Sequence, residues 1–278
     1  MARLCLGNVI KFKENKCMFN KKIVEEVLEN IEKKENENRI PKNLVEVRFE
    51  DGFTLSYFSD LPEIKVGDVV TVEGKMENQI AVVKKVLKSF KKPKFEMKWI
   101  SGVIDTNIAG VYFKIEDDVV SLDTTLTVEK FLSIYAGVKY KENEAVGEDD
   151  IELNLEELEK SDLFDDELVK IRGQKLFKDG FVPFIYLKSG VGKAVVRSSN
   201  GDEWYEIDFR CKRGRITYIA CDCPYFGNCK HLYAFLLKLR DFSKKFFEKY
   251  NNDSFVMCRK ECFNYIMSYG KGRVTIEL

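Results

Sequence analysis

Four side chains that commonly bind metal ions lie close together near the end of the chain: Cys221, Cys223, Cys229 and His231. They form a Cys-x-Cys pair and a Cys-x-His pair, and His231 is the only histidine in 278 residues. Zinc takes four nitrogen or sulfur ligands in a tetrahedron, and three cysteines with one histidine make a closed structural set. A catalytic zinc keeps one position open for water, so the filled set predicts a structural Zn²⁺.

The two pairs can converge on one ion if the first pair ends a strand and the second pair opens a helix. Residues 224–228 between them read Pro-Tyr-Phe-Gly-Asn, which is suitable turn chemistry. The alternative is a redox-active or disulfide-forming Cys-x-Cys beside an unrelated core histidine. The compact spacing and the lack of any secretory feature favour the metal site.

The segment around these ligands resembles the SWIM zinc finger family, whose motif is Cys-x-Cys, a variable gap and Cys-x-His. The resemblance covers about residues 168–241 and all four ligands match. It implies a β-β-α unit around zinc that binds DNA or protein partners and has no catalytic role. The upstream and downstream residues that share the likeness are Arg172-Gly173, 180–182, 194–196, 204–207, Ile216 and 234–237.

The charges of the chain are unevenly distributed, although 46 basic residues balance 46 acidic ones. Residues 142–167 hold 13 acidic residues and one basic residue, whereas residues 168–278 hold 21 Lys and Arg against 11 Asp and Glu. Such asymmetry indicates contact with a polyanion at the basic end. Ion-pair networks of the kind seen in thermophilic proteins are the alternative explanation.

The composition, with 45% hydrophobic and 33% charged residues, is that of a soluble globular protein. No apolar run is long enough to span a membrane, and the first residues lack the apolar core of a signal peptide. We therefore expect a cytoplasmic protein without a membrane partner, whose thiols stay reduced and available to a metal.

The first 98 residues are expected to form an OB-like β-barrel domain. Asp51-Gly52 is a strong hairpin signal between two alternating segments. The segment Val66 to Lys75 resembles the fourth strand of OB-folds, and another small β-barrel is the alternative. Strands are predicted at 4–12, 44–49, 53–58, 69–73 and 80–87, with one helix at 20–31.

A lysine-rich stretch follows the last of these strands, and Phe90, Phe95 and Trp99 are interleaved with it. Alternating basic and aromatic residues suit a groove for single-stranded nucleic acid. A solvated linker is the other interpretation, and we favour it.

The middle of the chain is harder to interpret. Residues 99–141 are expected to be a β-rich extension, either a second small barrel or an α+β insert. Residues 142–167 combine acidic side chains with leucines, which predicts an acidic linker or a solvated helix pair. A segment that folds over the basic face and imitates nucleic acid is the alternative. Residues 168–278 are expected to form the zinc-bound β-β-α module with trailing helices, so the whole chain is a mostly β member of the α+β class.

Basic residues of the C-terminal module are the candidates for contact with nucleic acid. Period-two alternation predicts a strand at 205–211, which continues into a basic turn. Such a turn can lie along a phosphate backbone, or it can be an ordinary solvated turn. Further lysines are expected on the exposed face of the helix that begins near Cys229. The predicted contacts are Arg210, Lys212, Arg213, Arg215, Lys230, Lys238, Lys244 and Lys245.

The sequence contains no catalytic motif that would indicate an enzyme or a small-molecule substrate. A P-loop, a Gly-x-Ser-x-Gly elbow and a dinucleotide fingerprint are all missing, although a nuclease could hide among scattered carboxylates. We therefore expect a DNA-binding accessory factor in replication, recombination or repair, with single-stranded DNA as one candidate ligand. The alternative is an adaptor whose zinc module docks a recombinase, a helicase or another enzyme.

Overall fold

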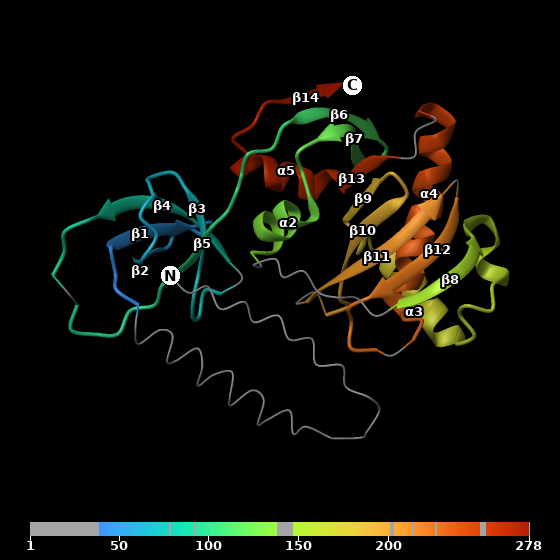
Figure 1. Cartoon of the computed structure of the whole chain (residues 1–278), viewed down its shortest axis with the longest axis horizontal. Coiled ribbons are helices and arrows are strands. Elements are labelled where there is room, and N and C mark those ends of the chain that lie inside the picture. Colours follow the sequence, from blue (N-terminus) through green and yellow to red (C-terminus); the bar gives the residue numbers. More distant parts are fainter. Residues whose placement is uncertain are drawn as a thin grey trace, which may run out of the picture.

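The structure is a computed structural model that describes residues 39–77, 79–91, 93–137, 147–200, 203–212, 214–225, 227–250 and 254–277, with backbone alone at 147–150 and 247–250. The predicted strand at 4–12 and helix at 20–31 lie outside these residues. The described chain forms a small sheet and a large sheet, with short helices between them (Figure 1).

The small sheet contains five antiparallel strands from the first part of the described chain. Apolar and polar residues alternate along its first strand: Val45, Val47 and Phe49 are buried, while Glu46 and Arg48 are exposed. Gly52 turns the first hairpin with φ +87°, a conformation that favours glycine. The strands are β1 (Asn43–Phe49), β2 (Thr54–Ser59), β3 (Val69–Val72), β4 (Ile80–Leu87) and β5 (Ile100–Val103).

An OB-like barrel is not confirmed by the small sheet. Its strand order is β2-β1-β4-β3-β5, which leaves β2 and β5 at the edges. Within the described residues, only an isolated parallel bridge between Phe58 and Trp99 links these edges, with Phe58 N donating to the carbonyl of Lys98 at 2.9 Å. Trp99 and Phe58 are buried against each other at 5.4 Å between ring centroids, so Trp99 is a core residue and no stacking platform.

The large sheet contains nine strands, in the order β14-β6-β7-β13-β9-β10-β11-β12-β8. All neighbours are antiparallel except β14 and β6. The predicted segment 99–141 is divided between the sheets: β5 belongs to the small sheet, whereas the next two strands, β6 and β7, belong to the large one. The described part of this segment therefore forms no second barrel. The strands are β6 (Gly110–Ile115), β7 (Asp118–Thr124), β8 (Gly147–Asn154), β9 (Phe184–Lys188), β10 (Val191–Arg197), β11 (Trp204–Lys212), β12 (Arg215–Cys221), β13 (Phe255–Arg259) and β14 (Val274–Glu277).

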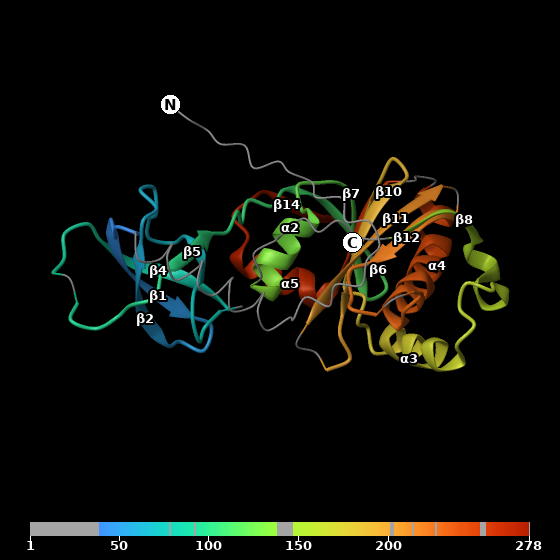
Figure 2. The same ribbon diagram turned by 60° about the horizontal axis from the view of Figure 1, so that its bottom comes forward.

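Helices cover both faces of the large sheet, so successive strand residues are buried on opposite sides. Ile185 packs with α3 (Glu167–Lys178) and α4 (Lys230–Tyr250), whereas Phe184 packs on the opposite side. That second side is covered by α2 (Val128–Phe131), the π-helical turn η1 (Leu132–Ala136) and α5 (Lys260–Tyr269). Figure 2 shows α2 and α5 between the two sheets and α3 and α4 beyond the large one.

Helix α4 lies at the centre of the C-terminal part and is apolar on nearly every side at its start. The predicted core residues Leu232, Phe235, Leu236, Leu239 and Phe242 are each at most 3% exposed. The neighbouring residues 233, 234 and 237 are buried as well, because α3 covers the face turned away from the sheet. A helix that is hydrophobic all round is a buried one, so the expected broad basic face is not present along these turns.

The acidic segment 142–167 differs from the expected linker or solvated helix pair. From residue 147 it forms β8, which pairs with β12 at the edge of the large sheet, and the 3₁₀ turn η2 (Leu155–Lys160). Leu153, Leu155 and Leu158 are at most 4% exposed in the same core as α4. The burial of these leucines explains why the segment is ordered onto the sheet despite its charge.

Candidate metal centre

The four predicted ligands come together at the junction between β12 and α4. Cys221 ends the strand, Cys223 and Cys229 lie in the connecting turn, and His231 is in the first turn of the helix. Their ligand atoms all lie within 4.8 Å of one another. A tetrahedron with zinc–sulfur bonds of about 2.3 Å has edges of about 3.8 Å, so a small contraction would close the set on one ion.

Backbone contacts hold the two ligand pairs in place. Asp222 lies between the first two cysteines, and its Oδ1 accepts a hydrogen bond from Glu206 N of β11 at 2.8 Å. Its own amide donates to the carbonyl of Glu206 at 3.1 Å. At the second pair, Leu232 N in the first turn of α4 lies 3.5 Å from Cys229 Sγ, so the N-terminus of the helix faces the sulfur. Amides at a helix N-terminus favour negative charge, so this end of α4 suits a thiolate.

His231 is buried and is oriented by its surroundings. Its Nδ1 lies 3.8 Å from Cys229 Sγ, and the ring of Tyr205 covers it at 4.5 Å between centroids. Its Nε2 is buried without a hydrogen-bond partner among the described residues. The ring also hydrogen-bonds with Cys223, so His231 contacts the thiols of the cluster directly, as a fourth metal ligand would.

The three thiols cannot all ionise while they face only one another. The pKa of Cys223 is lowered because Cys221 and Cys229 donate hydrogen bonds to its sulfur. The pKa of Cys221 is raised because it donates to Cys223 and Cys229 and is buried. Cys229 accepts from Cys221, which lowers its pKa, but its hydrogen bond to Cys223 and its burial dominate and raise it to about 11. A divalent cation would remove this conflict by favouring every thiolate.

This cluster could therefore hold a metal ion, and its donor set suits zinc. A bound ion would cross-link β12 to α4. Its role would be structural, because protein side chains would fill all four coordination positions. The three other described cysteines form no disulfide and are buried, as expected for small hydrophobic residues: Cys211, Cys258 and Cys262.

The predicted nucleic-acid contacts at the turn between β11 and β12 are partly neutralised by neighbours. Arg215 Nη1 lies 2.6 Å from Glu152 Oε1 on the acidic strand β8. The guanidinium of Arg210 lies over the Tyr218 ring at 5.1 Å. Lys212 is exposed, and Arg213 lies outside the described residues.

The predicted contacts along α4 fall in three different environments. Lys238 Nζ forms a 2.6 Å ion pair with Asp118 Oδ2, with both side chains largely buried, so this lysine is not on the expected exposed basic face. Lys245 pairs with Glu116 and Asp241 at 2.7 and 3.1 Å. Lys244 is exposed. Only Lys230 lies beside the metal cluster, where its Nζ donates to Ser199 Oγ at 2.9 Å.

A groove beside the metal cluster was not predicted from the sequence. It has a volume of about 250 Å³ and combines basic, aromatic and ligand side chains. Gly173 brings α3 against the start of α4, since a Cβ there would lie 2.8 Å from the carbonyl oxygen of Lys230. This close approach places Arg172 at the groove. The lining residues are Val169, Arg172, Tyr205, Cys223, Pro224, Tyr225, Cys229, Lys230 and His231.

Two groove residues are absent from the predicted contacts. The sequence places Tyr225 in the turn between the two ligand pairs, and in the structure this residue is 56% exposed. A large aromatic residue inside a metal-binding turn is a signal for a contact surface, because nothing local requires it. Arg172 gives no such local signal, since it lies on a separate helix.

Comparison with models of known protein families, with curated proteins and with solved structures found no match. Within the described part of the chain, no helix has the length and apolar character needed to cross a bilayer.

Proposed function

We propose that the chain is a nucleic-acid-binding protein whose Cys/His cluster holds a structural zinc ion. The groove beside that cluster is the observation that carries the proposal. It places two cationic side chains, Arg172 and Lys230, around the exposed ring of Tyr225. Cationic groups follow the phosphates of a strand and aromatic rings stack with its bases, so this combination suits a single-stranded segment.

The charge of the groove residues is available for phosphate. Among the described residues, neither Arg172 nor Lys230 forms an ion pair with a carboxylate, and the one recorded contact of Lys230 Nζ is to a serine hydroxyl. At the β11–β12 turn, Arg215 already has Glu152 as a partner. The groove is therefore the better candidate surface.

The resemblance to SWIM zinc fingers adds support from the residues. The chain has the Cys-x-Cys and Cys-x-His pairs, an antiparallel hairpin of β11 and β12 before them, and α4 directly after them. That order is compatible with the β-β-α unit which the resemblance implies. A role as an accessory factor in replication, recombination or repair remains part of this proposal.

A second function, docking of a protein partner, is favoured by the apolar side chains near the same groove. Leu168 and Ile171 on α3, the helix that supplies Arg172 to the groove, are 58% and 59% exposed, and Tyr225 in the groove is 56% exposed. Exposed apolar clusters often mark protein interaction sites. The two functions differ in salt dependence, because only phosphate contacts release counterions.

Fluorescence anisotropy of labelled oligonucleotides, titrated with the full-length chain at several salt concentrations, tests the proposal. We expect single strands to bind more tightly than duplexes of the same sequence. Tyr225→Ala should weaken single-strand binding by about 1–3 kcal/mol, the contribution of one stacked base. Arg172→Gln should reduce the slope of log affinity against log salt by about one.

Lys114→Gln is the matched control, because Lys114 is exposed on β6, outside the groove. It should leave affinity unchanged beyond a small general effect of charge. The proposal fails if the full-length chain binds neither oligonucleotide at low salt. Equal effects of Arg172→Gln and Lys114→Gln would show that any binding is not located in the groove.

A further inference from the structure

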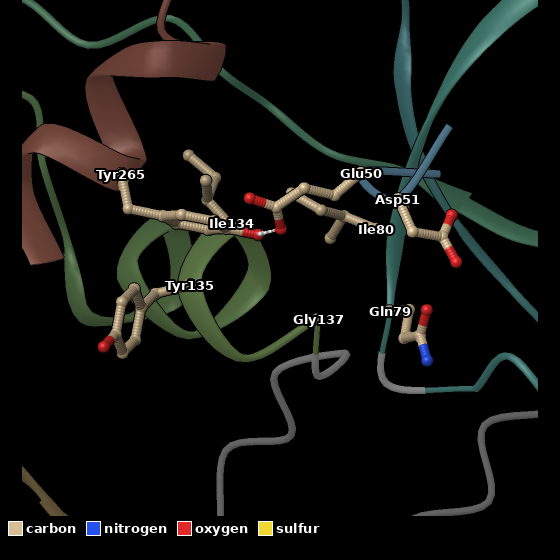
Figure 3. Close-up of a pocket in the computed structure, with 8 residues that line it drawn as sticks. All are labelled: Glu50, Asp51, Gln79, Ile80, Ile134, Tyr135, Gly137 and Tyr265. Carbon is tan, nitrogen blue, oxygen red and sulfur yellow. Dashed lines mark hydrogen bonds between the residues drawn. The ribbon is translucent and has the colours of Figure 1, made fainter. Parts of the chain in front are cut away.

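A second cavity lies between the small sheet and two helical elements, η1 and α5, which cover one face of the large sheet. It has a volume of about 420 Å³, within the range of small-molecule sites. The β1–β2 turn and the start of β4 form one side, and η1 and α5 form the other (Figure 3). The lining residues are Glu50, Asp51, Gln79, Ile80, Ile134, Tyr135, Gly137 and Tyr265.

Two tyrosine rings give this cavity aromatic walls. The rings of Tyr135 and Tyr265 are 5.5 Å apart between centroids and nearly perpendicular, at 88°. Tyr265 Oη donates to Glu50 Oε2 at 3.3 Å, as Figure 3 shows. The Tyr135 hydroxyl hydrogen-bonds with the thiol of Cys262, away from Glu50. The hydroxyls are therefore engaged. The rings also pack on other aromatic rings, Tyr135 on Phe131 and Trp204 and Tyr265 on Tyr269, so only the remaining part of each half-buried ring faces the cavity.

Among the residues that the structure describes, the charged part of the lining is negative. Glu50 and Asp51 contribute two carboxylates, and no described lysine or arginine lines the cavity. Neither carboxylate forms an ion pair within the described residues. Asp51 Oδ1 accepts only the amide of Phe53, at 2.9 Å. A neutral or anionic ligand would leave these charges uncompensated.

We propose that the cavity binds an alkylammonium cation, either a free small molecule or the side chain of a methylated lysine. The carboxylates would neutralise the charge, while the tyrosine rings and Ile80 would contact the alkyl groups. Aromatic faces attract such cations through their quadrupoles, and quaternary ammonium groups are recognised in this way. This inference is independent of the nucleic-acid function, because no residue of the metal centre or its groove is involved.

Titration calorimetry of the full-length chain with choline tests the proposal. The control ligand is 3,3-dimethylbutan-1-ol, which has the shape of choline but no charge. A short peptide with one trimethyllysine, beside its unmodified form, distinguishes a partner's side chain from a free cation. We expect choline or the trimethyllysine peptide to bind, and the neutral alcohol to bind at least about threefold more weakly.

Glu50→Gln should weaken binding of the cation about threefold to fivefold, the scale of one partly exposed ion pair. Tyr265→Phe should retain binding because it keeps the ring, and Tyr265→Leu should lose it. Glu46→Gln changes an exposed glutamate on β1, the strand that precedes Glu50; it is the matched control and should have no effect. Absence of binding, equal binding of the alcohol, or equal effects of Glu46→Gln and Glu50→Gln would overturn the proposal.

Discussion

Lys238 shows how burial changes the role of a single charged residue. Its place on a lysine-rich helix predicted a contact with phosphate, but its ammonium instead faces Asp118, which is 120 residues away in the chain. The two side chains are only 16% and 10% exposed. Burial raises the pKa of Asp118, while Lys238 opposes that shift. Removing the lysine would leave a buried carboxylate without its ion-pair partner, and only the charge of Arg259 would still favour its ionised form.

Lys238→Met should therefore destabilise the protein by about 3 kcal/mol, because breaking a buried pair leaves one charge uncompensated. Urea unfolding at neutral pH measures the loss. Lys244→Met, which changes an exposed lysine of the same helix, should cost no more than about 0.5 kcal/mol. Equal stabilities of the two variants would contradict the structural role.

The pH dependence of the Lys238→Met variant gives a second readout of the same pair. The folded-state pKa of Asp118 is above its ordinary value, so the ionised carboxylate costs stability above that pKa and the protonated form does not. The deficit of Lys238→Met should be largest near neutral pH and should shrink as the pH falls through the folded-state pKa of Asp118. A deficit that grows on acidification would contradict this assignment.

At the scale of elements, the crossing of α3 over α4 determines the metal centre and its groove. The crossing depends on Gly173, since a Cβ there would lie 2.8 Å from the Lys230 oxygen and 2.9 Å from Tyr233 Cβ. Lys230 is the residue between Cys229 and His231, so displacement of α3 would move backbone that carries two ligands. Gly173 is helical, so the position does not require the unusual backbone angles that glycine allows. It requires the absence of a Cβ.

Gly173→Ala should destabilise the protein by about 1–3 kcal/mol, the usual cost of overpacking. Alanine is favoured over glycine by about 1 kcal/mol inside a helix, so propensity alone predicts the opposite sign. Gln174→Ala, at an exposed position of the same helix, is the control. Chemical unfolding measures whether overpacking or helix propensity determines the stability of the variant. A Gly173→Ala protein more stable than wild type would refute the close-packing explanation.

Elements with a clear period could be predicted from the sequence, and elements buried on both faces could not. The alternation in β1 and the Asp51-Gly52 turn gave the correct hairpin. Phe255–Arg259 lies where the sequence predicts one of the trailing helices of the C-terminal module, but it forms β13, with four successive buried residues. A short continuous apolar run fits either a central strand or a buried helix, so period alone cannot separate them.

At the scale of the whole molecule, the arrangement of the large sheet depends on contacts between distant segments. Strand β13 inserts between β7 and β9, and β8 reaches the far edge beside β12. Local sequence carries no signal for such pairings. The four ligands were identified from residue type and spacing, whereas the groove needs Arg172 from another helix. For the same reason, the cavity at the junction, with Glu50 and Tyr265 on its two sides, was not predicted.

Metal content measured together with thermal unfolding of the full-length chain tests the central claim most directly. We expect one zinc ion per chain, and we expect Cys223→Ser and His231→Ala to lose it. The loss should destabilise the protein by more than about 4 kcal/mol, because a structural zinc contributes folding free energy. Cys262→Ala, which removes a buried thiol outside the cluster, should keep its zinc. Ligand variants that retain zinc and unfold at the wild-type temperature would contradict the assignment of a structural metal centre.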